Sequence, residues 1–397
     1  MTFTLLMDLD DTLLDTNIDS FIPFYFKKLS TFMASKIQPD LFIQSLIEST
    51  QVMYSNTLMD KTLEKAFSDD FYPRLGIDEA ELKDSLEQFY DNIFPTLGSV
   101  TKIRPEAIEF VEWAFSQGWE IAIATDPLFP RKAILHRLRW AGLAPEKYPF
   151  KLISDFQHFH FVKANGVFYP EFLFQMGWNE EPVLMVGDSL KREIEPCVKN
   201  GVPVFLLTQD YSSDTDHLPS GWFGNLKDFL KNIDINSLKV NNSTPEAIIS
   251  FLKATPAVIN TQMLLHDSEH ITRNFDHKDM SYKDTLTKLR DLERDVNLTA
   301  LEKITGEKYR NSATGELIPH QGIINKDSNE ILDTYNEFLS LRKIMVDKLS
   351  VLSLHEWNGS GKITNSDKST LMDLMKNTIE QDRVQIFRGR QILESQI

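Results

Sequence analysis

A series of short apolar runs before residue 235 constrains the fold more than any other feature of this sequence. The runs are FTLLM (3–7), EIAIAT (120–125), FKLIS (150–154), PVLMVGD (182–188) and PVFLL (203–207). Strands that are buried on both faces of a parallel sheet have nearly continuous apolar sequences, and helical segments connect them. We therefore expect an α/β fold, a Rossmann-like parallel sheet with crossover helices.

The segment between the first two runs is long and has the pattern of helices. We expect a helical cap, roughly residues 15–100, inserted directly after the first strand. At that point of an open α/β fold an insertion lies beside the carboxyl ends of the strands, where ligands bind. Its aromatic residues, among them Phe21, Phe24, Tyr25 and Phe26, either line a substrate pocket or pack the cap's own core.

The pattern changes after a polar stretch rich in Asn and Ser, and we predict a linker over 236–244. Beyond it, amphipathic segments cover roughly 245–272, 281–304, 327–352 and 366–393. Four such segments joined by loops are typical of a four-helix bundle. Ser281 and Asp284 have the spacing of a capping box that opens the second helix. The expected domains are therefore an α/β domain over 1–235 and an all-α bundle over 245–397.

Composition limits the partners and the compartment. Forty-two basic and 58 acidic residues give a net charge of −16, which argues against nucleic acid as a partner because phosphate backbones require a basic surface. A single cysteine, Cys197, excludes an intrachain disulfide framework. The N-terminal apolar run is too short for a signal peptide, and no run reaches the roughly 18 apolar residues of a membrane span. We expect a cytoplasmic protein with no membrane partner.

Four carboxylates crowd the end of the first run. In MDLDDTLLDT (7–16), Asp8, Asp10, Asp11 and Asp15 follow the apolar residues directly. Like charges this close repel one another unless a cation or protons neutralise them. Asp8 and Asp10 are two positions apart and point to the same side of an extended chain. The cluster is either a solvated acidic turn or, in part, a metal site, and we expect Asp11 and Asp15 to belong to the turn or to cap the first cap helix.

Polar groups also stand at or near the ends of the other runs. Thr125 and Asp126 end one run, Lys163 lies in HFVKANG, and Asp188 follows VLMVG, with Glu193 five positions later. The carboxyl ends of parallel strands share one edge of a sheet, so these groups can converge with Asp8 and Asp10. Carboxylates and a carbonyl oxygen suit a hard octahedral cation such as Mg2+. A lysine and a threonine hydroxyl suit the oxygens of a phosphoryl group.

With these motifs, residues 1–235 resemble the haloacid dehalogenase-like hydrolase superfamily. DLDDT (8–12) has the DxDxT form, and Thr125, Lys163 and GDSLKRE (187–193) complete the pattern. The long helical insertion matches the superfamily's helical cap. The sequence departs from the pattern at Glu193, where Asp is commoner, and at Ala164, where Pro usually follows the lysine.

The resemblance implies a role for each matching residue. Asp8 would be the nucleophile and Asp10 the general acid/base. The backbone carbonyl of Asp10 would also coordinate the metal. Thr125, Asp126 and Lys163 would bind the phosphate. Mg2+ would be held by Asp8, Asp10 and Asp188, with Glu193 in a supporting role.

The general acid selects among the reactions of this superfamily. A phosphatase expels an alkoxide that Asp10 can protonate, whereas a dehalogenase expels a halide that needs no proton. We therefore expect a Mg2+-dependent phosphatase that acts on a small phosphomonoester. A phosphomutase or dehalogenase on the same scaffold, or a non-catalytic binding or regulatory protein, remains an alternative.

Residues 245–397 resemble the DinB-like four-helix bundles, through MSYKDTLTKLRDLERDV (280–296) and IEQDRVQIFR (379–388). The metal-binding histidines of that family correspond here to Lys288, Gln381 and Gln385, so we expect no metal at that site. His266 and His270, four positions apart on the first helix, could present two nitrogens to a metal or be ordinary helix residues. The bundle is expected to serve a protein partner or self-association.

Overall fold

The computed structural model describes residues 2–209, 218–266, 281–305, 330–359 and 369–394. The chain forms two compact units. Unit 1 comprises Met1–Phe172 and Glu180–Val240, and unit 2 comprises Leu173–Asn179 and Asn241–Ile397. The chain therefore contributes to unit 2 twice, which the pattern of the sequence did not indicate.

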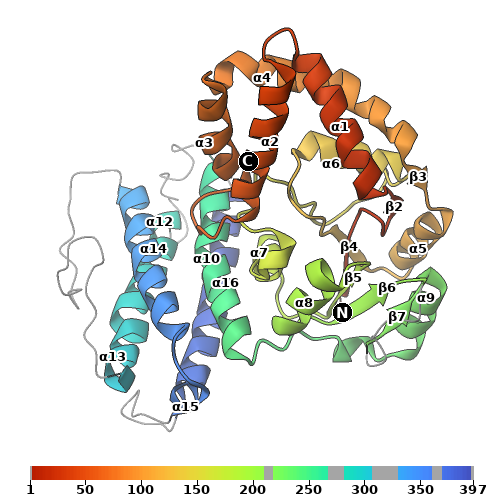
Figure 1. The fold of residues 1–397 in the computed structure, drawn as a ribbon. Helices are drawn as coiled ribbons and strands as arrows, with labels where there is room; N and C mark the ends of the chain where they lie inside the picture. Colours follow the sequence, from red (N-terminus) through yellow and green to blue (C-terminus); the bar gives the residue numbers. More distant parts are fainter. Residues whose placement is uncertain (1, 210–217, 267–280, 306–329, 360–368, 395–397) are drawn as a thin grey trace. The chain divides into compact units, whose positions relative to one another are not determined.

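Unit 1 contains a parallel five-stranded sheet with the order β4-β1-β5-β6-β7 (Figure 1). The strands are β1 (Thr4–Met7), β4 (Glu120–Ile123), β5 (Val183–Gly187), β6 (Val204–Leu207) and β7 (Ser220–Gly221). In register, Leu6 pairs with Ala122 on one side and Met185 on the other. Every residue of β1, β5 and β6 is buried, as expected for runs that are apolar throughout. The α/β fold class predicted from these runs is confirmed.

The run at 150–154 does not form a regular strand, contrary to the sequence prediction. It lies beside β4 and forms a single parallel bridge between Ile123 and Ile153. The Lys151 N–H donates to Ile121 O, and the Ile123 N–H donates to Leu152 O, both at 2.8 Å. Among the described strands, β4 is the only one with which this segment pairs. The chain turns away at Asp155, whose carboxylate accepts the His158 N–H at 3.1 Å. Both circumstances keep the pairing short.

A helical cap is inserted after β1, with α1 (Ile18–Met33), α2 (Pro39–Tyr54), α3 (Leu63–Leu75) and α4 (Glu79–Gln88). The π-helix η1 (Phe89–Ile93) and the 3-10 helix η2 (Phe94–Val100) complete it. An antiparallel ribbon of β2 (Leu14–Asp15) and β3 (Lys102–Ile103) joins both ends of the insertion. The cap helices form a group apart from α5 (Pro105–Ser116) and α9 (Phe223–Asn232), which pack on the sheet.

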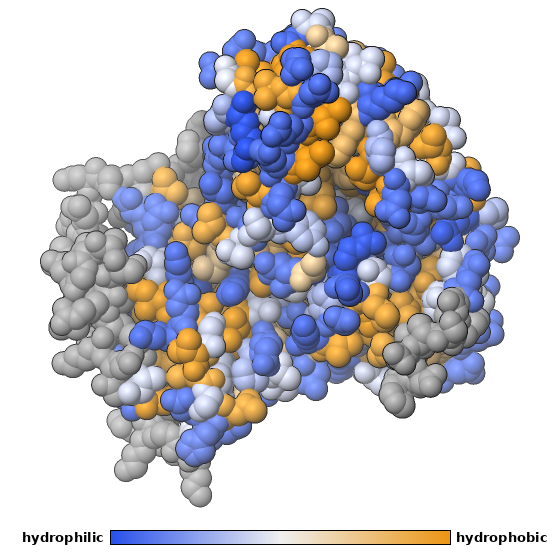
Figure 2. Space-filling model, in the orientation of Figure 1, coloured by the Kyte–Doolittle hydropathy of each residue, from blue (hydrophilic) through white to orange (hydrophobic). Residues whose placement is uncertain are grey.

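Local sequence sets the cap boundaries. The Asn17 side chain accepts the Ser20 N–H and begins α1, and the Thr62 hydroxyl accepts the Lys65 N–H and begins α3. Gly76 ends α3 in the left-handed conformation, at φ 67°. The cap has its own aromatic core, in which Phe21, Tyr25, Phe89 and Phe94 are in ring contact. Apolar side chains are also exposed on its outer surface (Figure 2).

One face of the sheet packs on α5, α9 and α6 (Arg131–Trp140). The other elements of unit 1 are the 3-10 helices η3 (Lys163–Asn165) and η5 (Ile235–Ser237), the π-helix η4 (Leu190–Ile194) and α8 (Glu195–Lys199), with α7 (Phe168–Gln175) beginning in this unit. Leu238 O accepts the Val183 N–H at 2.8 Å. The first residues of the predicted linker thus pack on β5.

Unit 2 is helical, and its main helices are α10 (Pro245–Leu265), α12 (Tyr282–Asp291), α14 (Glu330–Leu349) and α16 (Leu371–Glu394). The π-helix η6 (Leu292–Leu298) and α13 (Thr299–Thr305) continue α12, and α15 (Leu354–Trp357) is a short turn. The capping box of Ser281 and Asp284 is confirmed. Of the described helices, α10 alone is long and apolar enough to cross a membrane. Most of its apolar window is buried inside the protein, as in the core helix of a bundle.

A buried charge network links the helices of unit 2. The Arg342 guanidinium donates to Glu293 Oε1 at 2.7 Å, to Asp382 Oδ2 at 2.7 Å and to Leu252 O at 2.9 Å. The Thr255 hydroxyl donates to Asp382 Oδ2 at 2.7 Å. The two carboxylates and the guanidinium are fully buried, so the ionised groups of this core are paired with one another.

The positions that correspond to the DinB-like metal ligands do not meet in this core. Lys288 and Gln381 are exposed, whereas Gln385 is buried. The helix α10 ends at Leu265, and His266 is its C-cap in an extended conformation rather than a helix residue as predicted. His270 lies outside the described residues.

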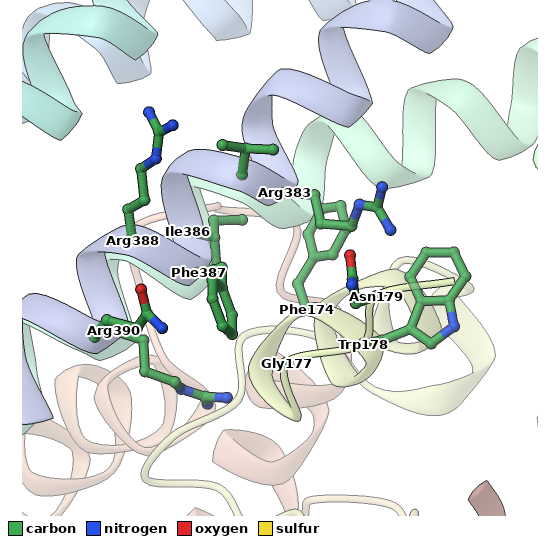
Figure 3. A pocket seen from close by; sticks show the side chains of 11 residues that line it. Phe174, Gly177, Trp178, Asn179, Arg383, Ile386, Phe387, Arg388 and Arg390 are labelled. Carbon is green, nitrogen blue, oxygen red and sulfur yellow. The ribbon is translucent and has the colours of Figure 1, made fainter. Parts of the chain in front are cut away.

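Unit 2 also contains a cavity of about 240 Å3. Figure 3 shows its walls: Phe174, Gly177, Trp178 and Asn179 on one side, and Arg383, Ile386, Phe387 and Arg390 of α16 on the other. The arginines are engaged with the protein itself. Arg390 donates to Gln175 O, and Arg383 lies 5.8 Å from the centre of the Trp178 ring.

Candidate active site

The loops at the carboxyl ends of β1, β4 and β5 bring charged groups together. Asp8 follows β1, and its N–H donates to Val186 O of β5 at 3.0 Å. Lys163 begins η3, and its backbone N–H donates to Asp126 Oδ1 at 3.1 Å. The ammonium of Lys163 contacts Asp8 Oδ1 at 2.5 Å and Glu193 Oε1 at 2.9 Å. Asp8, Lys163 and Glu193 are thus in direct contact although they are far apart in sequence.

Burial and charge shift the protonation equilibria of these groups. Burial alone would lower the pKa of Lys163, but Asp8 and Glu193 outweigh it and raise that pKa. The ammonium therefore stays charged. Burial, followed by the charge of Asp8, raises the pKa of Asp188 to about 6. Burial raises the pKa of Glu193 to about 7 and also raises that of Asp126. The site is rich in carboxylates that are costly to ionise without a further positive charge.

Three of these carboxylates could hold a metal ion. One oxygen each from Asp8, Asp188 and Glu193 lies within 4.8 Å of the others. Asp188 Oδ1 is buried, and no hydrogen-bond partner for it is found among the described residues. Burying a carboxylate oxygen without a hydrogen-bond donor costs free energy unless a cation coordinates that oxygen. Hard oxygen ligands of this kind suit Mg2+, so the residues present fit the ion.

A glycine permits the close packing of this cluster. A Cβ added at Gly187, the last residue of β5, would lie 2.7 Å from the Glu193 Cγ. Glu193 in turn accepts the Ser189 N–H at 2.5 Å through Oε2. The glycine therefore lets Glu193 fold back against the strand end and reach Lys163.

Asp10 lies at the same edge, but its carboxylate is turned to different partners. The Thr16 hydroxyl donates to Asp10 Oδ1 at 2.7 Å, and Arg137 forms an ion pair with Oδ2. The Asp10 carboxylate is absent from the acidic cluster that could hold a metal. Asp11 has a positive φ of 58°, and its carboxylate accepts the N–H groups of Thr16 and Asn17. It is thus part of the turn that leads into α1.

Thr125 follows β4 and is buried, and its carbonyl accepts the Ser154 hydroxyl at 2.7 Å. Asp126, the next residue, is partly buried and anchors the backbone of Lys163 through the hydrogen bond described above. Asp126 thus holds the backbone of the lysine in place, and it is also one of the residues that line the cavity under the cap.

Arg137 is a residue of this site that the sequence analysis missed. It is on α6 and only 1% exposed, and burial lowers its pKa to about 9. Its guanidinium lies 4.9 Å from the ring centre of Phe129 and 5.6 Å from that of Phe21. Ala133, Ile134, Arg137 and Leu138 are the buried residues of α6. The one available signal was therefore a charged residue at helical spacing on the apolar face of RKAILHRLRW (131–140).

A large cavity extends from this end of the site into the cap. It measures about 640 Å3, and Asp10, Asp126, Arg137 and Arg192 are among its lining residues. Residues of α1, α2, α3 and α4 form much of the remaining wall. The cavity lies entirely within unit 1.

Comparison with known proteins gives a family for the first half of the chain. Residues 4–199 match the model of the haloacid dehalogenase-like hydrolases. Among similar solved structures is a HAD phosphatase from Thermococcus onnurineus, with 18% identity, a TM-score of 0.38, and coverage of 58% of this chain and 98% of that one. Another is a 2-haloacid dehalogenase from Pseudomonas syringae pv. Tomato DC3000, with 17% identity, a TM-score of 0.42, and coverage of 58% and 99%. No curated protein matches the sequence.

Proposed function

Residues 4–199 form a haloacid dehalogenase-like hydrolase domain and the protein is a hydrolase; from this premise we propose that it is a Mg2+-dependent phosphatase that forms an aspartyl-phosphate on Asp8. One observation carries the proposal. Asp8, Glu193 and the half-buried Asp188 form an acidic cluster, and the Lys163 ammonium contacts two of its members. Such a site combines a carboxylate nucleophile with the positive charge that phosphoryl transfer requires.

Asp8, Asp188 and the backbone carbonyl of Asp10 would hold Mg2+, with Glu193 beside them. When bound, the ion supplies positive charge that offsets the charge of the phosphoryl oxygens. Lys163 supplies a second positive charge at the nucleophile, and the Thr125 hydroxyl would bind a phosphoryl oxygen. Asp126 contributes to phosphate binding indirectly, because it accepts the backbone N–H of Lys163 and so positions the lysine.

The Asp8 carboxylate attacks phosphorus, the bond to the leaving oxygen breaks, and the phosphoryl group is transferred to Asp8. Asp10 gives a proton to the leaving oxygen and later takes one from the water that hydrolyses the aspartyl-phosphate. The ion pair with Arg137 favours the ionised Asp10 that the second step needs.

We also infer a cytoplasmic protein with a small-molecule substrate and no membrane partner. The net charge of −16 supports the further inference that nucleic acid is not a partner. For unit 2, we retain the DinB-like resemblance and a role in protein binding or self-association as predictions. The internal neutralisation of its charged core by Arg342 supports a bundle that needs no metal to fold.

A phosphatase assay tests the proposal. We expect the purified chain to hydrolyse p-nitrophenyl phosphate in Mg2+, with activity lost in EDTA and restored by added Mg2+. Asp8→Asn should abolish turnover, because an amide is a poor nucleophile, and should be purified in parallel to exclude a contaminating phosphatase. Full activity in a metal-free preparation, or in Asp8→Asn, would contradict the proposal.

The same protein should also be assayed for halide release from a 2-chloroacid and for transfer of phosphate between sugar hydroxyls. Release of halide without phosphate release would identify a dehalogenase. Isomerisation of a sugar phosphate faster than its hydrolysis would identify a phosphomutase.

A further inference from the structure

The cavity beneath the cap is larger than a phosphate group requires. Its volume of about 640 Å3 is within the roughly 300–1,000 Å3 of pockets that enclose drug-sized ligands. Asp10, which would protonate the leaving oxygen, lies on its wall. The part of a substrate that continues beyond that oxygen therefore enters this cavity.

Most of the cavity wall is apolar. Residues from the cap helices and from the loop after β4 line it, among them Ile22, Phe26, Phe42, Phe67, Phe71 and Phe129. A wall of this kind binds hydrocarbon because it removes apolar surface from water. It also disfavours hydroxyl groups, which would lose their hydrogen bonds to water without gaining partners.

Several polar groups of the wall are already bound to other groups of the protein. The Tyr25 and Tyr90 hydroxyls are hydrogen-bonded to each other at 2.9 Å. Lys132 forms ion pairs with Glu87 and Asp91, and these side chains are exposed. Arg137 is committed to Asp10 and to two aromatic rings. These groups are bound within the protein and are not free to hold polyol hydroxyls. Other polar residues, among them Glu64, Glu79 and Lys83, also line the cavity, but most of its wall is apolar.

We propose that the substrate is a phosphomonoester with a large apolar leaving group, aliphatic or aromatic, rather than a sugar or polyol phosphate. This inference rests on the proposed phosphatase function, whose general acid, Asp10, lines the cavity. The apolar group binds between the cap and the loop after β4, and the phosphate lies at Asp8.

A series of n-alkyl phosphates tests the inference. From ethyl to octyl, the leaving alcohols have similar intrinsic reactivity, so differences in kcat/KM report binding of the chain. We expect kcat/KM to rise about fourfold for each methylene that enters the cavity, below the micelle concentration. Glycerol 3-phosphate, similar in size to butyl phosphate, should react more slowly than butyl phosphate.

A pair of variants locates the binding site of the chain. Thr50 on α2 lines the cavity, and Thr31 on α1 does not. Each threonine hydroxyl donates to the carbonyl four residues earlier at 2.7 Å, so replacement by tryptophan removes the same bond in both. Thr50→Trp should lower the octyl-to-ethyl ratio of kcat/KM at least tenfold, whereas Thr31→Trp should leave the ratio unchanged.

The outcomes separate this inference from the proposed function. If p-nitrophenyl phosphate is hydrolysed but kcat/KM is independent of chain length, the inference is wrong and the phosphatase stands. If kcat/KM rises with chain length but Thr50→Trp behaves like Thr31→Trp, the chain binds outside this cavity, which also overturns the inference. If no phosphomonoester is hydrolysed, both fail.

Discussion

Replacing Arg342 by methionine should destabilise unit 2 strongly. Methionine retains much of the apolar volume of arginine but carries no charge and no N–H donor. The change leaves the carboxylates of Glu293 and Asp382 buried without the guanidinium that joins them. Breaking a buried ion pair by removing one partner costs about 3–5 kcal/mol. The four hydrogen bonds of this guanidinium, at 2.7, 2.9, 2.7 and 3.1 Å, place Arg342 within that class.

The loss of stability in Arg342→Met should depend on pH. Burial raises the pKa of Glu293, and the charge of Arg342 is the largest effect that opposes it. Without the guanidinium this pKa rises further. A carboxyl group whose pKa is higher in the folded than in the unfolded state binds protons on folding, so stability falls as pH rises. The deficit of Arg342→Met should therefore be greater at about pH 8 than at about pH 5.

Native-state hydrogen exchange measures this loss in unit 2 alone, which a whole-chain melting curve does not do. Peptides from α12 and α16 should exchange roughly a hundredfold to several thousandfold faster in Arg342→Met. Arg294→Met is the matched control, because the partners of Arg294 at Asp291, Asp295 and Glu337 are exposed to 39%, 42% and 44%. Ion pairs with exposed partners contribute about 1 kcal/mol or less to the free energy of unfolding.

Equal exchange rates in the two variants would refute the reasoning for the buried network. A second replacement sharpens the test. Asp382→Asn in the Arg342→Met background removes one of the two uncompensated charges and should recover part of the lost protection. A further loss in the double variant would show that packing, and not charge, explains the effect.

Three further predictions concern unit 1. Mg2+ should raise the melting temperature of the wild type but not that of Asp188→Asn. In EDTA, Asp188→Asn should melt at a higher temperature than the wild type, because a carboxylate beside Asp8 has been neutralised. Scanning fluorimetry measures the melting temperatures with and without Mg2+. Arg137→Met should lower kcat at least roughly tenfold by releasing Asp10, with partial recovery in Arg137→Lys and an unchanged circular dichroism spectrum. Gly187→Ala should lower both the melting temperature and activity, because its Cβ would lie 2.7 Å from the Glu193 Cγ; an active enzyme with unchanged melting would contradict this account.

The sequence by itself determined the parallel sheet and the position of the charged groups along it. Runs such as FTLLM and VLMV are almost continuously apolar, and only a strand covered on both faces buries such a run completely. The carboxyl ends of parallel strands share one edge, so Asp8, Thr125 and Asp188 had to lie near one another. These features depend only on neighbouring residues, so they can be predicted from the sequence without knowing which distant segments meet.

Tertiary structure decided which of those groups touch, and how the chain is divided. Arg137 pairs with Asp10, and Arg342 joins Glu293 to Asp382. The local sequence marks Arg137 as a charged residue on an apolar helix face, but it does not identify the partner of either arginine. Residues 150–154 have a strand-like pattern but pair only at one bridge, and Leu173–Asn179 belong to unit 2. Each of these outcomes depends on which segments distant in sequence meet, and apolar periodicity carries no information about the partner.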